Sequence, residues 1–314
     1  MRRTSPLLRL LGAVTVVAAV ALGLVSCADE SPAAAPPKGR LTVGSADAPE
    51  SRIIASMYAE ALRKAGYDVT ERLGGSRKTY LAGLESGALD AVPEYIGSLT
   101  EYYDAVLHGP DAPTRKPLAS GDPDRTYATL EGLVARHKLA VLTPSPATNQ
   151  VAVVVTKAFA DDNGLKTVSD LAAFSSQLVF GAGPDCERRR TCLPGLRSTY
   201  GLTFKEVRRL AAGDDATFEA FSKGTIQVGL VSSSAGGIAS VGLVVLRDDR
   251  QLQTADNITA LVRDTVPAEA RHVIDRVDRA LTTEKLQELN QRLRAENADP
   301  EKLADRFLRD AGLL

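Results

Sequence analysis

The sequence predicts an α/β fold of two lobes joined by a two-strand hinge. Short apolar strands alternate with segments of helical period through residues 40–262. The stretch from about Asn149 to about Leu246 resembles a complete α/β unit, inserted between an N-terminal α/β unit and a C-terminal run of helices. If the last part returns to the first lobe, two crossovers connect the lobes, and the cleft between them closes on a ligand by hinge motion.

Residues 1–26 are typical of an export signal. Three arginines supply positive charge, and an uncharged apolar run then extends from Leu10 to Leu24. This run is short for a membrane span, and its flanks suit a signal peptide. We therefore expect these residues to be removed from the exported chain.

The apolar run ends in Leu24-Val25-Ser26-Cys27, which matches the bacterial lipobox. The match predicts acylation of the Cys27 thiol and a chain that is lipid-anchored on the outer face of the cell membrane. The alternative is a plain secretory signal with an incidental cysteine. Residues 27–39 are rich in Ala and Pro and predict a flexible tether.

Composition excludes several classes of protein. Removing residues 1–26 leaves 288 residues, enough for two lobes, and removing their three arginines changes the formal net charge from −1 to −4. A small negative net charge does not indicate nucleic-acid binding, which needs a basic surface. The three histidines are scattered without an i, i+4 pair, so neither a metal site nor a cofactor is expected.

Two cysteines remain once Cys27 is assigned to the lipid. Cys186 and Cys192 are six positions apart, and in an oxidising compartment such a pair predicts a local disulfide. The closed loop is short, so its entropic contribution is modest and its expected role is to shape one loop. The alternative is two free thiols.

Hydrophobic periodicity defines the elements in order. Apolar residues recur at helical spacing from Glu50 to Ala65, before Gly66 at a helix end. Proline, glycine and aspartate between residues 105 and 125 predict a surface loop. Further helices are expected at 79–86 and 126–137. A short helix is expected to begin at the capping box 167–170, and another is expected to end at Phe221. The chain from 263 to the end is expected to be helical, with Asp299 as an N-cap and Pro300 at N1. Strands are expected at 41–43, 67–73, 89–92, 139–142, 151–156, 178–180, 226–231, 243–246 and 258–262.

These elements divide the chain into five parts. They are a signal peptide at 1–26, a tether at 27–39, the first part of lobe 1 at 40–146, lobe 2 at 147–247, and a return to lobe 1 with C-terminal helices at 248–314.

One stretch carries the functional prediction. The sequence Gly87-Ala88-Leu89-Asp90-Ala91-Val92-Pro93-Glu94-Tyr95-Ile96-Gly97-Ser98 resembles a signature of glycine betaine/choline-type substrate-binding proteins of osmoprotectant ABC importers. Further motifs resemble the family in the same order, namely Val43-Gly44-Ser45 with Glu50, Leu73-Gly74-Gly75-Ser76, Leu193-Pro194-Gly195-Leu196, Tyr200-Gly201-Leu202, Phe204-Lys205, and Val244-Val245-Leu246 with Asp248-Asp249. The resemblance runs from about residue 40 to the C-terminus and implies a bilobed periplasmic-binding-protein-like fold of type II.

The resemblance also implies roles for single residues. A quaternary ammonium has no N–H to donate, so aromatic faces hold it by cation–π contact. Tyr95 then forms one wall of the cage, Ser98 is a polar contact, and Arg189 binds the ligand carboxylate. The alternatives are a half-buried core tyrosine at Tyr95 and a shifted register at Arg189, because Arg188 and Arg190 are adjacent.

The sequence departs from the family's aromatic cage at three positions. Val151, Ser232 and Asp256 stand where the family places tyrosines, and aromatic residues make up only 5% of the chain. The charge of Asp256 can replace a π-face for a cation, whereas Ser232, Ser233, Ser234 and Asn149 suit a hydroxylated ligand. The alternative for residues 232–234 is a solvated turn.

The resemblance therefore predicts a monomeric solute-binding lipoprotein that delivers a small solute, of the glycine betaine, choline or quaternary ammonium class, to an ABC permease and its ATPase. The alternatives are a different polar, hydroxylated solute or a role as ligand sensor. An enzyme is not expected. The stretch 73–79 lacks the first glycine of a phosphate loop, there is no Gly-x-Ser-x-Gly elbow, and the spacing of Ser232–Ser234, Asp256 and His272 does not support a triad.

Overall fold

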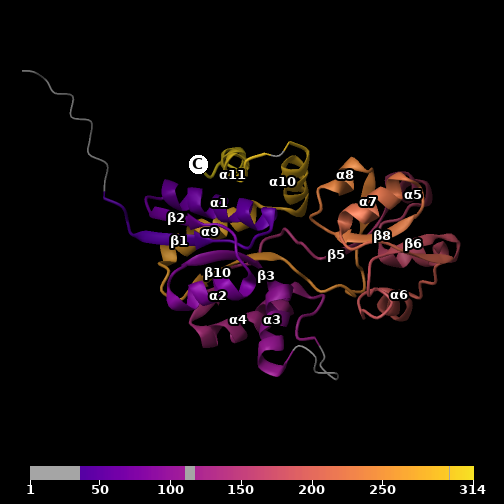
Figure 1. Cartoon of the computed structure of the whole chain (residues 1–314), viewed down its shortest axis with the longest axis horizontal. Coiled ribbons are helices and arrows are strands. Elements are labelled where there is room, and N and C mark those ends of the chain that lie inside the picture. The colour runs from indigo at the N-terminus through magenta and orange to yellow at the C-terminus, as the bar shows by residue number, and fades with distance from the viewer. Residues whose placement is uncertain (1–35, 110–116, 297) are drawn as a thin grey trace, which may run out of the picture. The chain divides into compact units, whose positions relative to one another are not determined.

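Two five-stranded mixed sheets organise the chain, each with helices on both faces (Figure 1). The computed structural model describes residues 36–109, 117–296 and 298–314. The predicted signal peptide, Cys27 and most of the predicted tether lie outside the described residues.

The first sheet and its helices are called lobe 1 below. Its strand order is β2-β1-β3-β10-β4, in which β1 is parallel to β2 and β3, while β10 is antiparallel to β3 and β4. The strands are β1 (Arg40–Gly44), β2 (Asp68–Arg72), β3 (Ala91–Tyr95), β4 (Leu139–Val141) and β10 (Ile258–Arg263).

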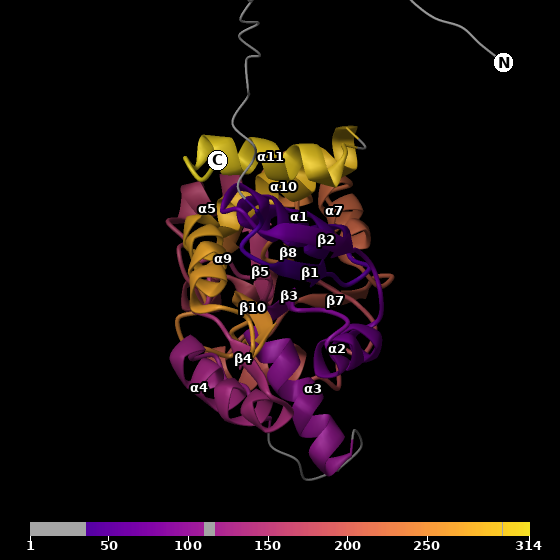
Figure 2. The ribbon, with the colours of Figure 1, turned by 90° about the vertical axis from the view of Figure 1, so that its left-hand side faces the viewer.

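Helices cover both faces of this sheet (Figure 2). Two separate buried clusters, one under each group of helices, form its core. On one face lie α1 (Pro49–Lys64), α9 (Ala268–Ala280), α10 (Thr283–Glu296) and α11 (Pro300–Asp310). On the other lie α2 (Arg77–Ser86), α3 (Ile96–His108) and α4 (Pro123–Val134), followed by the 3₁₀ turn 135–137.

The second sheet and its helices are called lobe 2. Its strand order is β7-β6-β8-β5-β9, with β5 antiparallel to both β8 and β9. The strands are β5 (Val151–Thr156), β6 (Val179–Ala182), β7 (Glu206–Arg209), β8 (Val228–Ser232) and β9 (Leu243–Leu246). The helices are α5 (Lys157–Asn163), α6 (Leu193–Tyr200), α7 (Asp214–Ser222) and α8 (Gly237–Ser240), with 3₁₀ turns at 168–173 and 175–177.

The C-terminal part returns to lobe 1, because β10 is inserted between β3 and β4. The two crossovers between the lobes run side by side in antiparallel directions. Thr148 and Asn257 form a β-bridge, and the backbone N–H of Asn149 donates to the Asp256 carbonyl at 3.0 Å. These bonds make the crossovers a two-strand hinge. The predicted boundaries of the five parts stay predictions.

Most predicted elements are confirmed, and the capped helix starts are among them. Asp299 accepts from the N–H of Glu301 at the start of α11, and the Thr167 capping box is present, although the turn that it opens is 3₁₀. The predicted loop at 105–125 is wrong at both ends, because α3 extends to His108 and α4 begins at Pro123.

A buried carboxyl group lies in the core of lobe 1. Asp278 on α9 is fully buried, and its Oδ1 accepts a hydrogen bond from the Tyr58 hydroxyl at 2.6 Å. Burial raises the pKa of Asp278 from 3.8 to about 8. The folded chain therefore holds a proton at neutral pH that the unfolded chain releases.

This proton makes stability depend on pH. Between the unfolded pKa of 3.8 and the folded pKa of about 8, the native state binds more protons than the unfolded state, so the free energy of unfolding falls as pH rises. We predict that Asp278→Asn removes this component, up to ~1.4 kcal/mol per pH unit. Urea unfolding at pH 5, 6, 7 and 8 measures it, and Asp162→Asn, at an exposed position on α5, is the control. An unchanged pH slope in Asp278→Asn would contradict the assignment.

Candidate ligand-binding site

A buried carboxylate lies at the contact between the lobes. Glu50 is the second residue of α1, follows Pro49 at N1 and is 7% exposed. Its Oε1 accepts from the Tyr95 hydroxyl at 2.5 Å and from Asn149 Nδ2 at 3.0 Å, and its Oε2 accepts from Asn290 Nδ2 at 2.6 Å. All three donors are neutral, so hydrogen bonds and the N-terminus of α1 stabilise the charge.

The Pro-Glu-Tyr motif at the end of β3 directs its two polar side chains to opposite faces of the sheet. Glu94 is 1% exposed, and both its oxygens accept from the Arg77 guanidinium at 2.8 Å. This ion pair fastens α2 to the sheet. Tyr95 points the other way, toward Glu50. Burial and the Glu50 carboxylate raise the pKa of the Tyr95 phenol well above its usual value, so the hydroxyl stays a donor.

Two glycines shape the loop beside this motif. Gly74 and Gly75 have φ of 93° and 145°, a region that favours glycine. The N–H of Gly74 donates to Ser45 Oγ at 2.9 Å, and that of Gly75 donates to Asp47 Oδ1 at 3.1 Å. The loop after β2 is thereby fixed to the turn after β1, next to Glu50.

Asp256 from the second crossover caps α3. Its Oδ1 accepts from the N–H groups of Gly97 and Ser98 at 2.9 and 2.8 Å, and its Oδ2 accepts from Ser98 Oγ at 2.5 Å. The N-cap residue itself, Tyr95, makes no side-chain cap bond. Burial raises the pKa of Asp256 to about 6, although the bonds from Ser98 oppose the shift. Asp256 and Ser98 therefore bind each other at the hinge.

The run Ser232–Ser234 is an interlobe contact, so the alternative of a solvated turn is wrong. Ser233 and Ser234 are 5% and 2% exposed. The Ser232 hydroxyl donates to Asn149 Oδ1, and the carbonyls of Ser233 and Ser234 accept from Gln287 and Asn290 on α10 at 2.7 and 2.9 Å. The end of β8 is thus held by the hinge and by α10.

A hollow of about 710 Å³ lies beside this contact. Its walls come from the start of α1, the hinge, the end of β8 and α10. They include Glu50, Asn149, Asp214, Ser232, Ser234 and Asn290. Burial raises the pKa of Asp214, whose Oδ1 accepts from the Ser232 N–H at 3.1 Å. Arg52, Arg294 and several apolar side chains complete the lining, so the hollow is mixed in character, and its amide, hydroxyl and carboxylate groups suit a small hydrophilic solute.

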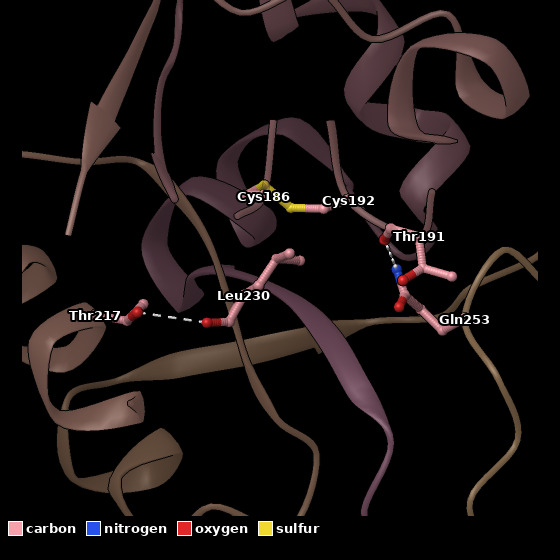
Figure 3. The surroundings of a disulfide bond; sticks show 6 residues. All are labelled: Cys186, Thr191, Cys192, Thr217, Leu230 and Gln253. Atoms are coloured by element: carbon pink, nitrogen blue, oxygen red, sulfur yellow. Dashed lines mark hydrogen bonds between the residues drawn. A yellow bond between two sulfur atoms is a disulfide. The ribbon is translucent and has the colours of Figure 1, made fainter. Parts of the chain in front are cut away.

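The predicted arginine loop lies elsewhere. The structure contains a disulfide between Cys186 and Cys192, with a Cα–Cα distance of 5.2 Å (Figure 3). The loop is fastened to the second crossover, because Gln253 Nε2 donates to the Thr191 carbonyl at 2.8 Å. Arg189 is exposed and does not line the hollow, and neither do Tyr95, Ser98 and Asp256.

The structure therefore brings five of the six predicted ligand residues to the hinge. Tyr95 and Asn149 both bind Glu50, and Asn149 also binds Ser232. Ser98 and Asp256 bind each other. Arg189 does not join either group through any hydrogen bond between described residues. Whether these six contact a ligand stays a prediction.

Sequence reasoning gave no role to two residues that organise the site. Glu50 entered only as part of a turn motif, and Asn290 lies in a polar C-terminal helix without a motif. The one available signal was an acidic residue in the first turn of a helix that follows a strand.

Within residues 36–109, 117–296 and 298–314, no group of three or more His, Cys, Asp or Glu side chains is arranged to hold a metal ion.

No helix in the described part of the chain is long and apolar enough to cross a membrane.

The hinge, the two sheets and a polar site between the lobes define a solute-binding protein. Residues 39–310 match the family model for the substrate-binding domain of ABC-type glycine betaine transport systems, and the chain belongs to this family. Its members are extracytoplasmic proteins that bind small ligands and work with a permease and an ATPase, and they are not enzymes.

Known proteins support this assignment. The chain is 29% identical to a glycine-betaine-binding protein of Pseudomonas aeruginosa, over 87% of this chain and 88% of that protein. It is 26% identical to the glycine betaine-binding protein YehZ of Escherichia coli, over 98% and 99%. The solved structure of apo YehZ from Escherichia coli has a TM-score of 0.77 at 24% identity, covering 89% of this chain and 100% of the solved chain, and it shows the same fold.

We predict that Asp256→Ala lowers the free energy of unfolding by about 1–2 kcal/mol, because α3 loses the acceptor for its first N–H groups. Asp256→Asn keeps one acceptor oxygen and lowers it less. Urea unfolding measures both. Equal stability of Asp256→Ala and the wild type would show that the carboxylate does not cap α3.

Proposed function

We propose that this chain binds a quaternary ammonium solute of the glycine betaine class and delivers it to an ABC permease. The observation that supports this most strongly is Tyr95, the aromatic residue of the family motif, which lies at the end of β3 with its hydroxyl fixed by Glu50. Fixing the hydroxyl restricts the ring, and a ring held in one orientation contacts a cation at lower entropic cost. Relatives named for glycine betaine agree with this ligand class.

Acidic groups compensate for the small number of aromatic residues in this proposal. Glu50 and Asp214 line the hollow together with Arg52 and Arg294, and these two arginines form their salt bridges with Asp47 and Asp215. The charge of Glu50 and Asp214 attracts a cation at long range. Tyr95 binds Glu50 from behind the lining of the hollow and would provide a π-face at short range once the lobes moved on binding. The ligand carboxylate would contact Arg189 if lobe 2 moved on binding.

A second candidate is a polar, hydroxylated solute. The observation that favours it is the lining of the hollow, where Asn149, Ser232, Ser234 and Asn290 offer amide and hydroxyl groups. Such groups recognise hydroxyls by paired hydrogen bonds and gain little from a trimethylammonium group.

Thermal melting separates the two candidates. The chain from residue 28 onward keeps the whole compact unit 37–314. A ligand that binds only the folded state raises the melting temperature. We expect glycine betaine or choline to raise it, and amino acids, polyols and sugars to leave it unchanged. A shift with polyols or sugars alone would favour the second candidate and overturn the first.

We predict that Tyr95→Ala weakens glycine betaine binding by about 10-fold, because the ammonium loses its π-face. Tyr95→Phe keeps the ring and is expected to bind more tightly than Tyr95→Ala. Isothermal titration calorimetry measures both, and Tyr127→Ala on α4 is the control. Equal affinities of Tyr95→Ala and the wild type would exclude Tyr95 from the site.

We further propose that Cys27 carries a lipid and that the mature chain is a monomer on the outer face of the membrane. The lipobox match and the Ala- and Pro-rich segment after it support this. We expect Cys27→Ser to move the protein from the membrane fraction to the soluble fraction of expressing bacteria. Retention of the Cys27→Ser variant in the membrane would contradict lipidation at this residue.

A further inference from the structure

The hydrogen bonds of Glu50 connect parts of the chain that are far apart in sequence. Its donors come from β3, the first crossover and α10, and Glu50 itself lies on α1. Tyr95 and Asn290 bind different oxygens of the same carboxylate. Any change in the position of that carboxylate therefore affects both residues.

The two asparagines also hold lobe 2. Asn149 Oδ1 accepts from the Ser232 hydroxyl, and Asn290 Nδ2 donates to the Ser234 carbonyl as well as to Glu50. Each asparagine thus bridges Glu50 and the end of β8. The Asn290 bridge is part of the contact between α10 and lobe 2, and the Asn149 bridge belongs to the first crossover.

That contact is close-packed. A Cβ atom on Gly236 would lie 2.6 Å from Asn290 C and from Gln291 Cα, so the backbone of α10 lies directly on this glycine. Gln291 Nε2 donates to Ser240 Oγ at 3.0 Å, and Arg294 pairs with Asp215. The apolar side of α10, with Leu286 and Leu289, belongs to the core of lobe 1. Helix α10 therefore bridges the two lobes beside the hinge, where the Thr148 N–H of the first crossover donates to Thr283 Oγ1 at 3.1 Å.

Hinge motion between the lobes changes the distance between α10 and the end of β8, unless this contact is the pivot. In either case, the geometry of the contact and the position of Glu50 depend on each other through Asn149 and Asn290. By thermodynamic linkage, a ligand held at Tyr95 changes the free energy of the α10 contact by the same amount as that contact changes the free energy of ligand binding.

We infer that Glu50 is a positioning residue that fixes Tyr95 and couples it to the contact of α10 with Ser232–Ser234. Ligand affinity then depends on how α10 packs on lobe 2, in addition to any contact from the α10 residues that line the hollow. The inference rests on the proposed function only where ligand affinity is the measured quantity.

A double-mutant cycle tests the coupling. Tyr95→Phe removes the hydroxyl that binds one oxygen of Glu50, and Asn290→Ala removes the amide that binds the other. Effects of substitutions at independent sites multiply in the dissociation constant, whereas residues that share a partner deviate from the product. We expect the glycine betaine Kd of the double variant to differ from the product of the single effects by at least about 3-fold.

Two further variants complete the design. Glu50→Gln keeps the size of the side chain but replaces the charge, and we expect it to weaken binding by about 10-fold with a smaller effect on the melting temperature than Glu50→Ala. Glu288→Gln is the matched control, since Glu288 is an exposed carboxylate on α10 that pairs with Arg292. It is expected to bind as the wild type does.

The outcomes separate the two proposals. Multiplicative effects in the cycle, or wild-type affinity of Glu50→Gln, would overturn the role of Glu50 even if glycine betaine binds. If the wild type bound no quaternary ammonium compound, the proposed function would fail. The same cycle scored by urea unfolding of the ligand-free chain would then decide on the coupling, with additive effects contradicting it and non-additive effects supporting it.

Discussion

The buried carboxylate of Glu50 is the interaction on which the arrangement of the site depends. A charge that is 7% exposed is costly to bury unless its oxygens accept hydrogen bonds, and the described structure supplies donors from Tyr95, Asn149 and Asn290. Loss of the carboxylate would remove an acceptor from three half-buried donors, of which Asn290 would keep the Ser234 carbonyl. The charge therefore holds together a helix start, a strand end, a hinge segment and a second helix.

The hinge has a second function besides joining the lobes. Its two crossovers are bonded to each other, and Asp256 in one of them supplies the cap that α3 lacks in its own sequence. Its neighbour Gln253 fastens the disulfide loop of lobe 2. The segment that permits lobe motion thus also fixes a helix of lobe 1 and a loop of lobe 2. The positions of candidate ligand residues in both lobes therefore depend on the conformation of the hinge.

Local patterns predicted much of the fold because their causes are local. The period of α1, the β-branched run of β5 and the Asp299 cap of α11 each depend on residues within one or two turns. No helix was predicted at α3, whose cap is provided by Asp256, 158 positions from Ser98. No local pattern contains that information.

The candidate site was predictable only where a motif marked it. Tyr95 and Ser98 followed from the Pro-Glu-Tyr motif, and the structure explains the adjacent Glu94 as the partner of Arg77 rather than of a ligand. Ser232–Ser234 could not be interpreted from sequence, because a polar run reads the same on a solvated turn and on an interface. Asn290 could not be predicted from sequence, because its role arises only when α10 packs on lobe 2.

The central proposal is that a cation binds against Tyr95 while Glu50 fixes the hydroxyl of that residue. A crystal structure of residues 28–314 with glycine betaine tests it most directly. We expect the trimethylammonium group within about 6 Å of the centre of the Tyr95 ring, with the hydroxyl still donating to Glu50. A ligand bound away from Tyr95, or a Tyr95 hydroxyl released from Glu50 in the complex, would contradict the account.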